Sequence, residues 1–442
     1  MAIHPIEFRY STEEMRAIFE EQNIFEKKLL VEAALAKAHA AVGNIPNGAA
    51  AEIEKAIPKV TLSRAKEIEE ETQHDVMAIV KALGEQCGEA GKYVHLGATS
   101  YDIVDTSWAL LLVEALEVVE KRLSEFKKVL LDSAKKYQDT IMVGRSHGQH
   151  GLPITLGLKF AVWAAEAQRN LERVQQAKEV VAVGKMTGAV GTSASFGKNA
   201  AKIQEHVMKG LGLKEPLATT QVVQRDRHAQ AILTLAMIGQ SLEKIGKEIR
   251  NLQRTEIGEV EEPFGKKQVG SSTMPQKRNP WKSERVCGLA RVLRSNVMPA
   301  LENIPLEHER DLTDSSCERV ILPESFVLCD FMLKEMIAIV SGLVVYPERM
   351  KENLKMSRGR NMGEAVMMAL TEKGIGRQEA HELVRAAAME SFENNIKMKE
   401  ALLKNAKIKE LLGEKGVEHA LKPENYLGAT KEHINTVLKK LG

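Results

Sequence analysis

Apolar residues recur at helical spacing over most of this chain. The stretch before residue 253 is typical, with apolar side chains at Ile232, Leu233, Leu235, Ala236, Ile238, Leu242, Ile245, Ile249 and Leu252. This spacing is typical of a helix that is buried against other helices. Prolines interrupt helix interiors, and they are absent from 59–152, 154–215, 217–262, 324–346 and 348–422. The pattern therefore predicts long helices within these intervals.

The longest predicted helix runs from about Thr219 to Glu262, where the apolar pattern has no proline or polar loop to end it. A helix of about 40 residues would be roughly 60 Å long, and it would be unstable outside a bundle, which we expect to be shared between subunits. The apolar stripe is wide, which favours a bundle over a simple coiled coil. Divisions near residue 100 and near Pro347 predict three domains: 1–99, 100–349 with the long helices, and 350–442.

Composition supports an all-α chain and excludes several functions. The 442 residues are 44% hydrophobic, 28% charged and 4% aromatic, which suits long helices better than a large antiparallel sheet. Lys and Arg (62) nearly balance Asp and Glu (60), so no overall field favours nucleic acid or an anionic membrane. No apolar run approaches the roughly 20 residues that span a bilayer.

Targeting signals and cysteines indicate the compartment. The N-terminal segment is polar and acidic and does not resemble a secretory signal. The four cysteines form no CxxC pair, so they predict free thiols rather than a disulfide framework or a zinc site. These features predict a soluble cytoplasmic protein.

The most informative segment is the loop GKKQVGSSTMPQKRNP at 265–280. Its glycines and prolines cannot continue a helix, and by composition alone it could be a basic surface loop. A P-loop is excluded because Ser271 stands where the lysine should be and a predicted helix, rather than a strand, precedes it. The string GSSTMPQKRNP closely resembles the signature of the fumarase/aspartase superfamily, whose members eliminate fumarate from succinyl compounds.

This elimination explains why such a loop is needed. The reaction needs a base held against a weakly acidic C–H bond, donors and cations around the neighbouring carboxylate, and exclusion of water. A glycine-hinged loop that closes over substrate can supply all three. By resemblance, Ser271 is the base, while Lys277 and Asn279 hold the succinyl carboxylates. The resemblance also implies substrate contacts from Ser272 and Met274.

The second segment is GRSHGQHGLPITLG at 144–157. Alone, His147 and His150 could be metal ligands on a helical turn, but no Asp, Glu or Cys completes a set, and such histidines are usually structural or exposed. Read with the signature loop, the string resembles the second motif of the superfamily. In adenylosuccinate lyases this histidine protonates the departing amino nitrogen, which implies that role for His147. Glu284 matches the glutamate that orients and charges it.

The third segment combines ETQHD at 71–75 with HLGATSYD at 95–102. Locally, it predicts a helix face, a glycine turn and an N-cap at Thr99 or Ser100. In the family this Thr-Ser pair binds a succinyl carboxylate at a helix start, where backbone N–H groups face an anion. The nucleotide pocket implied by the resemblance contains Gln73, His74 and Asp75, with His95 close by.

Further matches are to the adenylosuccinate lyases within the superfamily. They are an Arg-Tyr pair near the start, a glutamine in TTQVVQRDRH, an arginine after the signature, and the stretches HERD and SSCER. The matching residues are Arg9, Tyr10, Gln221, Arg285, Arg310, Ser315, Ser316 and Arg319. Together the arginines could cradle a phosphate dianion through paired N–H donors, although each alone would more often be a solvated surface residue.

The resemblance covers nearly the whole chain but is not complete. Gln276 stands where adenylosuccinate lyases usually have histidine and argininosuccinate lyases often have glutamine, and residues 359–364 lack the Ser-Gln-Arg of many bacterial enzymes. One alternative is an argininosuccinate lyase-like enzyme. Another is 3-carboxymuconate cycloisomerase, which shares TEIGEVEEP but lacks a histidine at position 147. A non-catalytic helical scaffold is the third, and the presence of both Ser271 and His147 argues against it.

The resemblance implies an all-α, three-domain fold and a homotetramer whose active sites are shared between subunits. The implied reaction is an anti β-elimination that converts adenylosuccinate to AMP and fumarate. The family also cleaves the succinylated aminoimidazole carboxamide ribotide (SAICAR) to AICAR in purine synthesis. The implied partner is thus a nucleotide, and no metal, organic cofactor, nucleic acid or membrane is expected.

Overall fold

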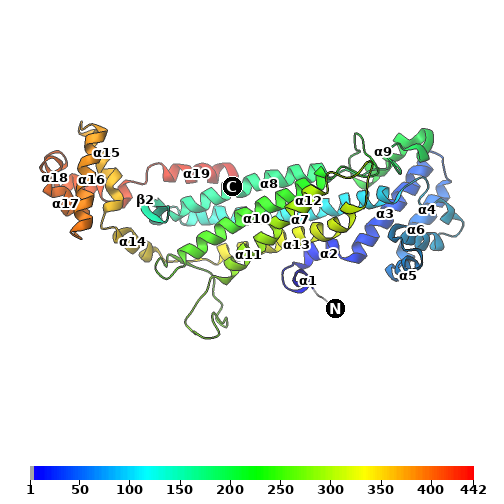
Figure 1. Cartoon of the computed structure of the whole chain (residues 1–442), viewed down its shortest axis with the longest axis horizontal. Coiled ribbons are helices and arrows are strands. Elements are labelled where there is room, and N and C mark those ends of the chain that lie inside the picture. Colours follow the sequence, from blue (N-terminus) through cyan, green and yellow to red (C-terminus); the bar gives the residue numbers. More distant parts are fainter. Residues whose placement is uncertain (1–3) are drawn as a thin grey trace. The chain divides into compact units, whose positions relative to one another are not determined.

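The computed structural model describes residues 4–442 and is 70% helical with few strands, which confirms the all-α fold (Figure 1). Contacts divide the chain into two units, each assembled from three stretches of sequence. Unit 1 comprises Met1–Ser124, Arg169–Leu242 and Gly288–Lys334; unit 2 comprises Glu125–Gln168, Glu243–Cys287 and Glu335–Gly442. The division into domains 1–99, 100–349 and 350–442 stays a prediction.

Four long helices contribute residues to both units: α7 (Ser100–Lys136), α8 (Leu156–Val181), α10 (Asp226–Leu252) and α13 (Thr313–Ser341). The prediction for 219–262 is wrong about both ends of α10. Before it, the chain forms a loop in which the Val223 N–H donates to the buried carboxylate of Asp105 (2.8 Å). After it, Gly258 takes a φ of 59°, which favours glycine and does not continue a helix. Within the described residues, α7 is the longest helix, with 37 residues.

Helix α13 continues through Pro323, where the proline pattern predicted an interruption. Proline lacks an N–H group, so one i→i−4 hydrogen bond is lost there. The neighbouring side chains of Leu322 and Phe326 are fully buried, and tertiary packing supplies most of the stability of a helix in a protein. Burial therefore offsets the missing bond.

Unit 1 also contains a set of shorter helices. They are α1 (Pro5–Phe8), α2 (Glu13–Phe19), α3 (Glu21–Ala41), α4 (Asn47–Ala56), α5 (Leu62–Thr72), α6 (Asp75–Gln86), α9 (Ala200–Leu211) and α12 (Val297–Glu302), with short 3-10 turns at Ile57–Lys59, Gly88–Tyr93 and Ala194–Asn199. One apolar cluster contains Leu29 of α3 and Leu83 of α6. A second joins α3, α7 and α9 through Leu35, Ile103 and Ile203. The second cluster holds the first turns of α7 against α3 and α9.

Unit 2 contains the strands and the C-terminal helices. Strand β1 (Ile141–Ser146) pairs antiparallel with β2 (Gln149–Thr155), an element that the helical pattern did not predict, and β3 (Val260–Glu261) pairs with β4 (Val344–Val345). The helices are α14 (Pro347–Met356), α15 (Gly363–Glu372), α16 (Arg377–Glu393), α17 (Met398–Lys404), α18 (Ala406–Ala420) and α19 (Thr430–Leu441), with 3-10 turns at Arg360–Met362 and Pro423–Asn425. Helices α15 to α18 share one apolar cluster.

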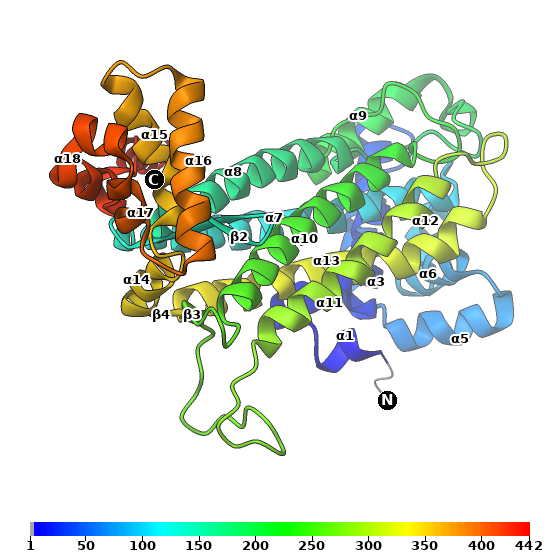
Figure 2. The same ribbon diagram turned by 60° about the vertical axis from the view of Figure 1, so that its left-hand side comes forward.

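The signature segment lies in the irregular loop between β3 and α11 (Trp281–Ser295), as Figure 2 shows. The loop itself confirms the prediction for 265–280. The element before it, however, is the two-residue strand β3 rather than a helix. Among residues 4–442, no helix has the length and apolar character needed to cross a membrane.

Candidate active site

In unit 2, a buried carboxylate at the start of the signature loop binds the backbone at the end of the loop. Glu262, which follows β3, accepts the backbone N–H groups of Lys282 (3.2 Å) and Ser283 (2.6 Å) at the start of α11. The first N–H groups of a helix have no partner within the helix, so this carboxylate satisfies two of them. Burial raises the pKa of Glu262. The residues between these fixed ends are mostly exposed.

Within the loop, the hydroxyl of Ser271 faces backbone donors. Its Oγ accepts the N–H groups of Thr273 (3.3 Å) and Met274 (3.1 Å). Donors of this kind favour the charged form of the group that accepts them. The geometry therefore suits an ionised serine better than an isolated hydroxyl would.

A tight turn brings the two ends of the signature motif together. The amide of Asn279 donates to the Gly270 carbonyl oxygen (3.1 Å). A Cβ atom on Gly270 would lie 2.0 Å from the Lys277 carbonyl oxygen, so no other residue fits at this position. The turn thus places Lys277 and Asn279 close to the backbone beside Ser271.

A cavity of about 820 Å³ lies beside this loop in unit 2. Four of the predicted site residues line it: Met274, Lys277, Asn279 and Glu284. Helix α10 adds Lys247 and Arg250, and the turn after it adds Arg254; these are three cations that the sequence analysis did not single out. Cations in a helical pattern usually form a solvated face. Only the position of these three beside the signature loop identifies them as candidate site residues. The excess of positive charge in the cavity suits an anionic ligand.

His147 lies in the turn of the β1–β2 hairpin rather than on a helical turn, and it is exposed. Its φ of 53° is uncommon for a residue other than glycine. Arg145, two residues before His147, donates to both carboxylate oxygens of the buried Glu259 (2.8 and 2.9 Å) and so holds the hairpin in place. Asn353 donates to the same carboxylate (2.7 Å). Within residues 4–442, no group of three or more His, Cys, Asp and Glu side chains is arranged to hold a metal ion.

In unit 1, predicted nucleotide-binding residues meet at the start of α6. His74 is the N-cap and accepts the Met77 N–H (3.3 Å), and its Nε2 lies 3.5 Å from the Ser100 hydroxyl. Asp75 accepts from Arg319 (2.8 Å) and Lys28 (3.5 Å). Burial alone would raise the pKa of Asp75, but these two cations outweigh it and hold the pKa below its ordinary value.

Lys28 was missed by the sequence analysis, because a lysine within a helical pattern is usually a solvated surface residue. Burial lowers the pKa of Lys28. A cavity of about 450 Å³ beside Lys28, Asp75 and Arg319 also has the aromatic side chains of Phe19 and Trp108 in its wall. Cations and aromatic rings in one cavity suit an anionic, partly planar ligand.

His95 is held by a buried carboxylate of α3. Its Nδ1 lies 2.6 Å from Glu32, which also accepts the His95 backbone N–H (3.1 Å). Burial alone would lower the pKa of His95, but the hydrogen bond and charge of Glu32 outweigh it and raise the pKa. The φ of His95 is 61°, and that of Gln73, at the end of α5, is 54°. Left-handed residues other than glycine persist where their surroundings enforce them, often at functional sites.

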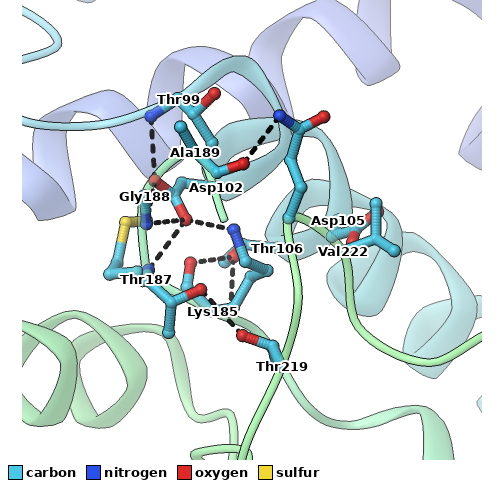
Figure 3. Close-up of polar contacts among 12 residues, drawn as sticks. Thr99, Asp102, Asp105, Thr106, Lys185, Thr187, Gly188, Ala189, Thr219 and Val222 are labelled. Carbon is cyan, nitrogen blue, oxygen red and sulfur yellow. Dashed lines mark hydrogen bonds and ion pairs between the residues drawn. The ribbon is translucent and has the colours of Figure 1, made fainter. Parts of the chain in front are cut away.

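The predicted N-cap is confirmed: α7 begins at Ser100, which makes Thr99 the N-cap residue. The Thr99 N–H donates to the side chain of Asp102 (2.9 Å), whose own N–H donates back to the Thr99 carbonyl (2.9 Å). Three backbone N–H groups and a lysine converge on this one carboxylate (Figure 3).

Gln221 and Arg310 meet beside the same helix start. The Gln221 side chain donates to the Ala189 carbonyl (2.9 Å) and accepts from Arg310 (3.0 Å). The guanidinium of Arg310 lies 3.4 Å from the centre of the Tyr101 ring. Its Nε and Nη2 atoms are buried and have no hydrogen-bond acceptor within the described residues. Nε lies 3.8 Å from the buried carboxylate of Asp314, an ion pair. Because a buried N–H group without a hydrogen-bond acceptor is costly, Nη2 favours an anionic ligand.

The remaining predicted residues are distributed over both units. Arg9 lies over the ring of Tyr10 (5.8 Å), which packs against Phe331. Ser315 hydrogen-bonds Tyr101, and Ser316 is exposed on α13. In unit 2, Ser272 is exposed, and Arg285 lies over Trp281 (4.4 Å) and pairs with Glu335 (3.2 Å). Unit 1 thus contains Arg9, Arg310 and Arg319, and a cradle of all four arginines stays a prediction.

Comparisons with known proteins cover the whole chain. A family model described as lyase matches residues 7–294, and one described as adenylosuccinate lyase C-terminus matches residues 359–437. The adenylosuccinate lyase of Pyrococcus abyssi is 57% identical over 440 residues, 99% of this chain and 98% of that protein. That of Methanothermobacter thermautotrophicus is 50% identical over 444 residues, 100% of this chain and 99% of that protein.

Solved structures agree on the fold at lower identity. A fumarate lyase from Mesorhizobium sp. BNC1 has a TM-score of 0.91 and 33% identity over 98% of both chains. A 3-carboxy-cis,cis-muconate lactonizing enzyme from Pseudomonas putida has a TM-score of 0.89 and 31% identity over 99% of this chain and 98% of that one. The fold alone is thus common to more than one activity, whereas the higher identities and the C-terminal match are more specific. The chain belongs to the adenylosuccinate lyase family.

Proposed function

We propose that this chain eliminates fumarate from adenylosuccinate, leaving AMP, and from SAICAR, leaving AICAR. The observation that carries the proposal is the match over the whole chain to relatives named adenylosuccinate lyase, one of them 57% identical. The geometry of the signature loop supports the same chemistry, because two backbone N–H groups donate to the hydroxyl of Ser271. A carbon–nitrogen lyase of this kind needs a stabilised base beside a cationic site.

In the proposed reaction, Ser271 removes the proton from the carbon beside a succinyl carboxylate. The negative charge that develops is spread onto that carboxylate, where Lys277 and Asn279 bind it. His147 gives a proton to the departing nitrogen, so the C–N bond breaks to release fumarate and a neutral amine. Glu284, which lines the same cavity as Lys277, orients that histidine.

Unit 1 supplies the proposed binding groups. The start of α7 and Gln221 take a succinyl carboxylate, and Arg310 and Arg319 take the phosphate. Two features support this assignment: the buried Nη2 of Arg310, which has no hydrogen-bond acceptor within residues 4–442, and the sharing of Asp75 between Arg319 and Lys28. Because Lys28 already compensates Asp75, Arg319 retains donors for a phosphate dianion.

The deciding experiment is an assay of the purified chain with adenylosuccinate, in which AMP and fumarate are separated by chromatography. We expect both products in equal amounts. Ser271→Ala serves as the control for a contaminating lyase. Argininosuccinate and 3-carboxymuconate, tested in parallel, address the alternative activities. Turnover of one of these substrates with none of adenylosuccinate would refute the proposal.

We also propose a cytoplasmic homotetramer whose active sites take residues from several subunits. All four cysteines are free thiols, which suits a reducing compartment, and several predicted site residues, His147 among them, are exposed in the single chain. His147→Ala and Ser271→Ala chains, each inactive, should recover about a quarter of the wild-type activity when mixed and allowed to exchange, because closed symmetric assembly pairs intact residues from different chains. Verified mixed tetramers without recovery would place both residues of a site on one chain.

A further inference from the structure

A buried ion pair lies at the start of α7. The side chains of Lys185 and Asp102 are both 0% exposed, and the ammonium group of Lys185 donates to Asp102. The same carboxylate accepts the backbone N–H groups of Thr99 (2.9 Å), Thr187 (2.9 Å) and Gly188 (3.1 Å) (Figure 3). Asp102 therefore fastens the turn before α7 to residues 187–188, and Lys185 supplies its counter-charge.

The position of this pair matters because of the charge at a helix end. The unpaired N–H groups at the start of α7 carry a partial positive charge that suits an anion. A lone carboxylate at Asp102 would oppose that charge and repel an anionic ligand. The positive charge of Lys185, which is buried from solvent, neutralises Asp102 and so removes this repulsion.

A second observation marks this helix end as a ligand site. Arg310, whose side chain is 10% exposed, lies over Tyr101, the residue after Ser100. Its Nε lies 3.8 Å from the carboxylate of Asp314, and its buried Nη2 has no hydrogen-bond acceptor in the part of the chain that the structure describes. Gln221, which bonds Arg310, also bonds the carbonyl of Ala189. Residues 187–189 thus connect the buried pair with this donor group.

We propose that Lys185 is a positioning residue: it neutralises Asp102 so that the start of α7 can bind a carboxylate of the succinyl group. The inference rests on the proposed function and adds a residue that touches neither substrate nor the reacting atoms. Two consequences follow. Loss of Lys185 should weaken succinyl binding specifically, and simultaneous loss of the Asp102 charge should restore it.

The expected size of the effect follows from Coulomb's law. A unit charge about 6 Å from a ligand carboxylate, at an effective dielectric constant of about 20, weakens binding roughly 100-fold. Lys185→Met should therefore raise the inhibition constant of fumarate roughly 100-fold and the KM for adenylosuccinate similarly. AMP has no succinyl group, so its inhibition constant should change by less than about fivefold.

Two further variants separate charge from folding. Asp102→Asn/Lys185→Met removes both charges while keeping an oxygen acceptor, and removal of a whole buried pair is often tolerated, so fumarate inhibition should return to within about fivefold of wild type. Arg122→Met is the matched control. Arg122 also lies on α7, and its Nε donates to the buried Asp330 (3.0 Å). Loss of this ion pair should lower the stability of the protein without changing fumarate inhibition.

Native circular dichroism and inhibition by fumarate and AMP decide the matter. A folded Lys185→Met protein with wild-type fumarate inhibition overturns the inference, as does an equal loss for fumarate and AMP. If Lys185→Met does not fold, the double variant carries the test: a 100-fold loss of fumarate affinity with neither charge present also overturns it. A wild-type chain that releases no fumarate contradicts the proposed function instead, so the two failures are distinguishable.

Discussion

Arg225 provides a direct test of the buried charges in unit 1. Its side chain is 1% exposed; it donates to Asp105 (3.0 and 3.2 Å) and Asp314 (2.9 Å) and lies 3.2 Å from Glu318. All three carboxylates are buried. Arg225→Met leaves them without their principal cation, and breaking a buried ion pair by removing one partner costs about 3–5 kcal/mol. We expect the free energy of unfolding to fall by that amount.

Urea unfolding of the native protein measures this loss. Circular dichroism and tryptophan fluorescence should both monitor the transition, because one probe does not establish two-state behaviour in a chain of two units. The midpoint should fall by about 1 M or more. Arg64→Met is the matched control, since Arg64 donates to both oxygens of Glu85 (2.9 and 2.8 Å) but is exposed, so its loss should shift the midpoint little. Equal shifts for the two variants would refute the argument that burial makes the Arg225 cluster costly to break.

Three further predictions concern the proposed site. Ser271→Ala should lower kcat at least about 100-fold with little change in KM, because it removes an interaction used mainly in the transition state; near-normal fumarate release would place the base elsewhere. Arg319→Ala should raise the KM for adenylosuccinate about tenfold by removing charge-assisted hydrogen bonds to phosphate, and unchanged KM and AMP affinity would show that Arg319 only pairs with Asp75. Glu32 raises the pKa of His95, so its stabilisation is fully present below the unfolded value of about 6.5 and is lost as pH rises through the folded pKa. The stability lost in Glu32→Gln, measured by urea unfolding, should therefore grow from about pH 9 to about pH 6, and a constant difference would refute the link.

The apolar pattern predicted the helices better than their ends. Apolar periodicity reports a buried face, which α10 has from Ile232 to Leu252. It does not report where backbone groups find partners outside the helix, as Val223 does on Asp105. The β1–β2 hairpin was missed for a related reason: it is short, and its turn residues around His147 were interpreted as chemistry rather than as a change of direction.

The sequence predicted those parts of the candidate site whose residues are adjacent in the chain and form a motif. The signature loop follows from adjacent residues, and so does an N-cap at Thr99 or Ser100, of which the structure selects Thr99. Lys185 and Lys28 could not be found in this way, because their partners lie far away in sequence. Asp102, for example, precedes Lys185 by 83 positions. An isolated lysine in a helix or loop resembles a solvated one until the fold buries it against a carboxylate.

One physical device recurs at the segments that carry the proposed chemistry. Each is held by a buried carboxylate: Asp102 at the start of α7, Glu262 at the signature loop, and Glu259 at the hairpin of His147. A carboxylate accepts several N–H groups at once, and charged hydrogen bonds are stronger than neutral ones. Such a carboxylate therefore fixes the backbone of a segment through polar contacts. In the signature loop and the His147 hairpin, Ser272, Lys277 and His147 stay exposed, as a proposed site for a charged nucleotide requires.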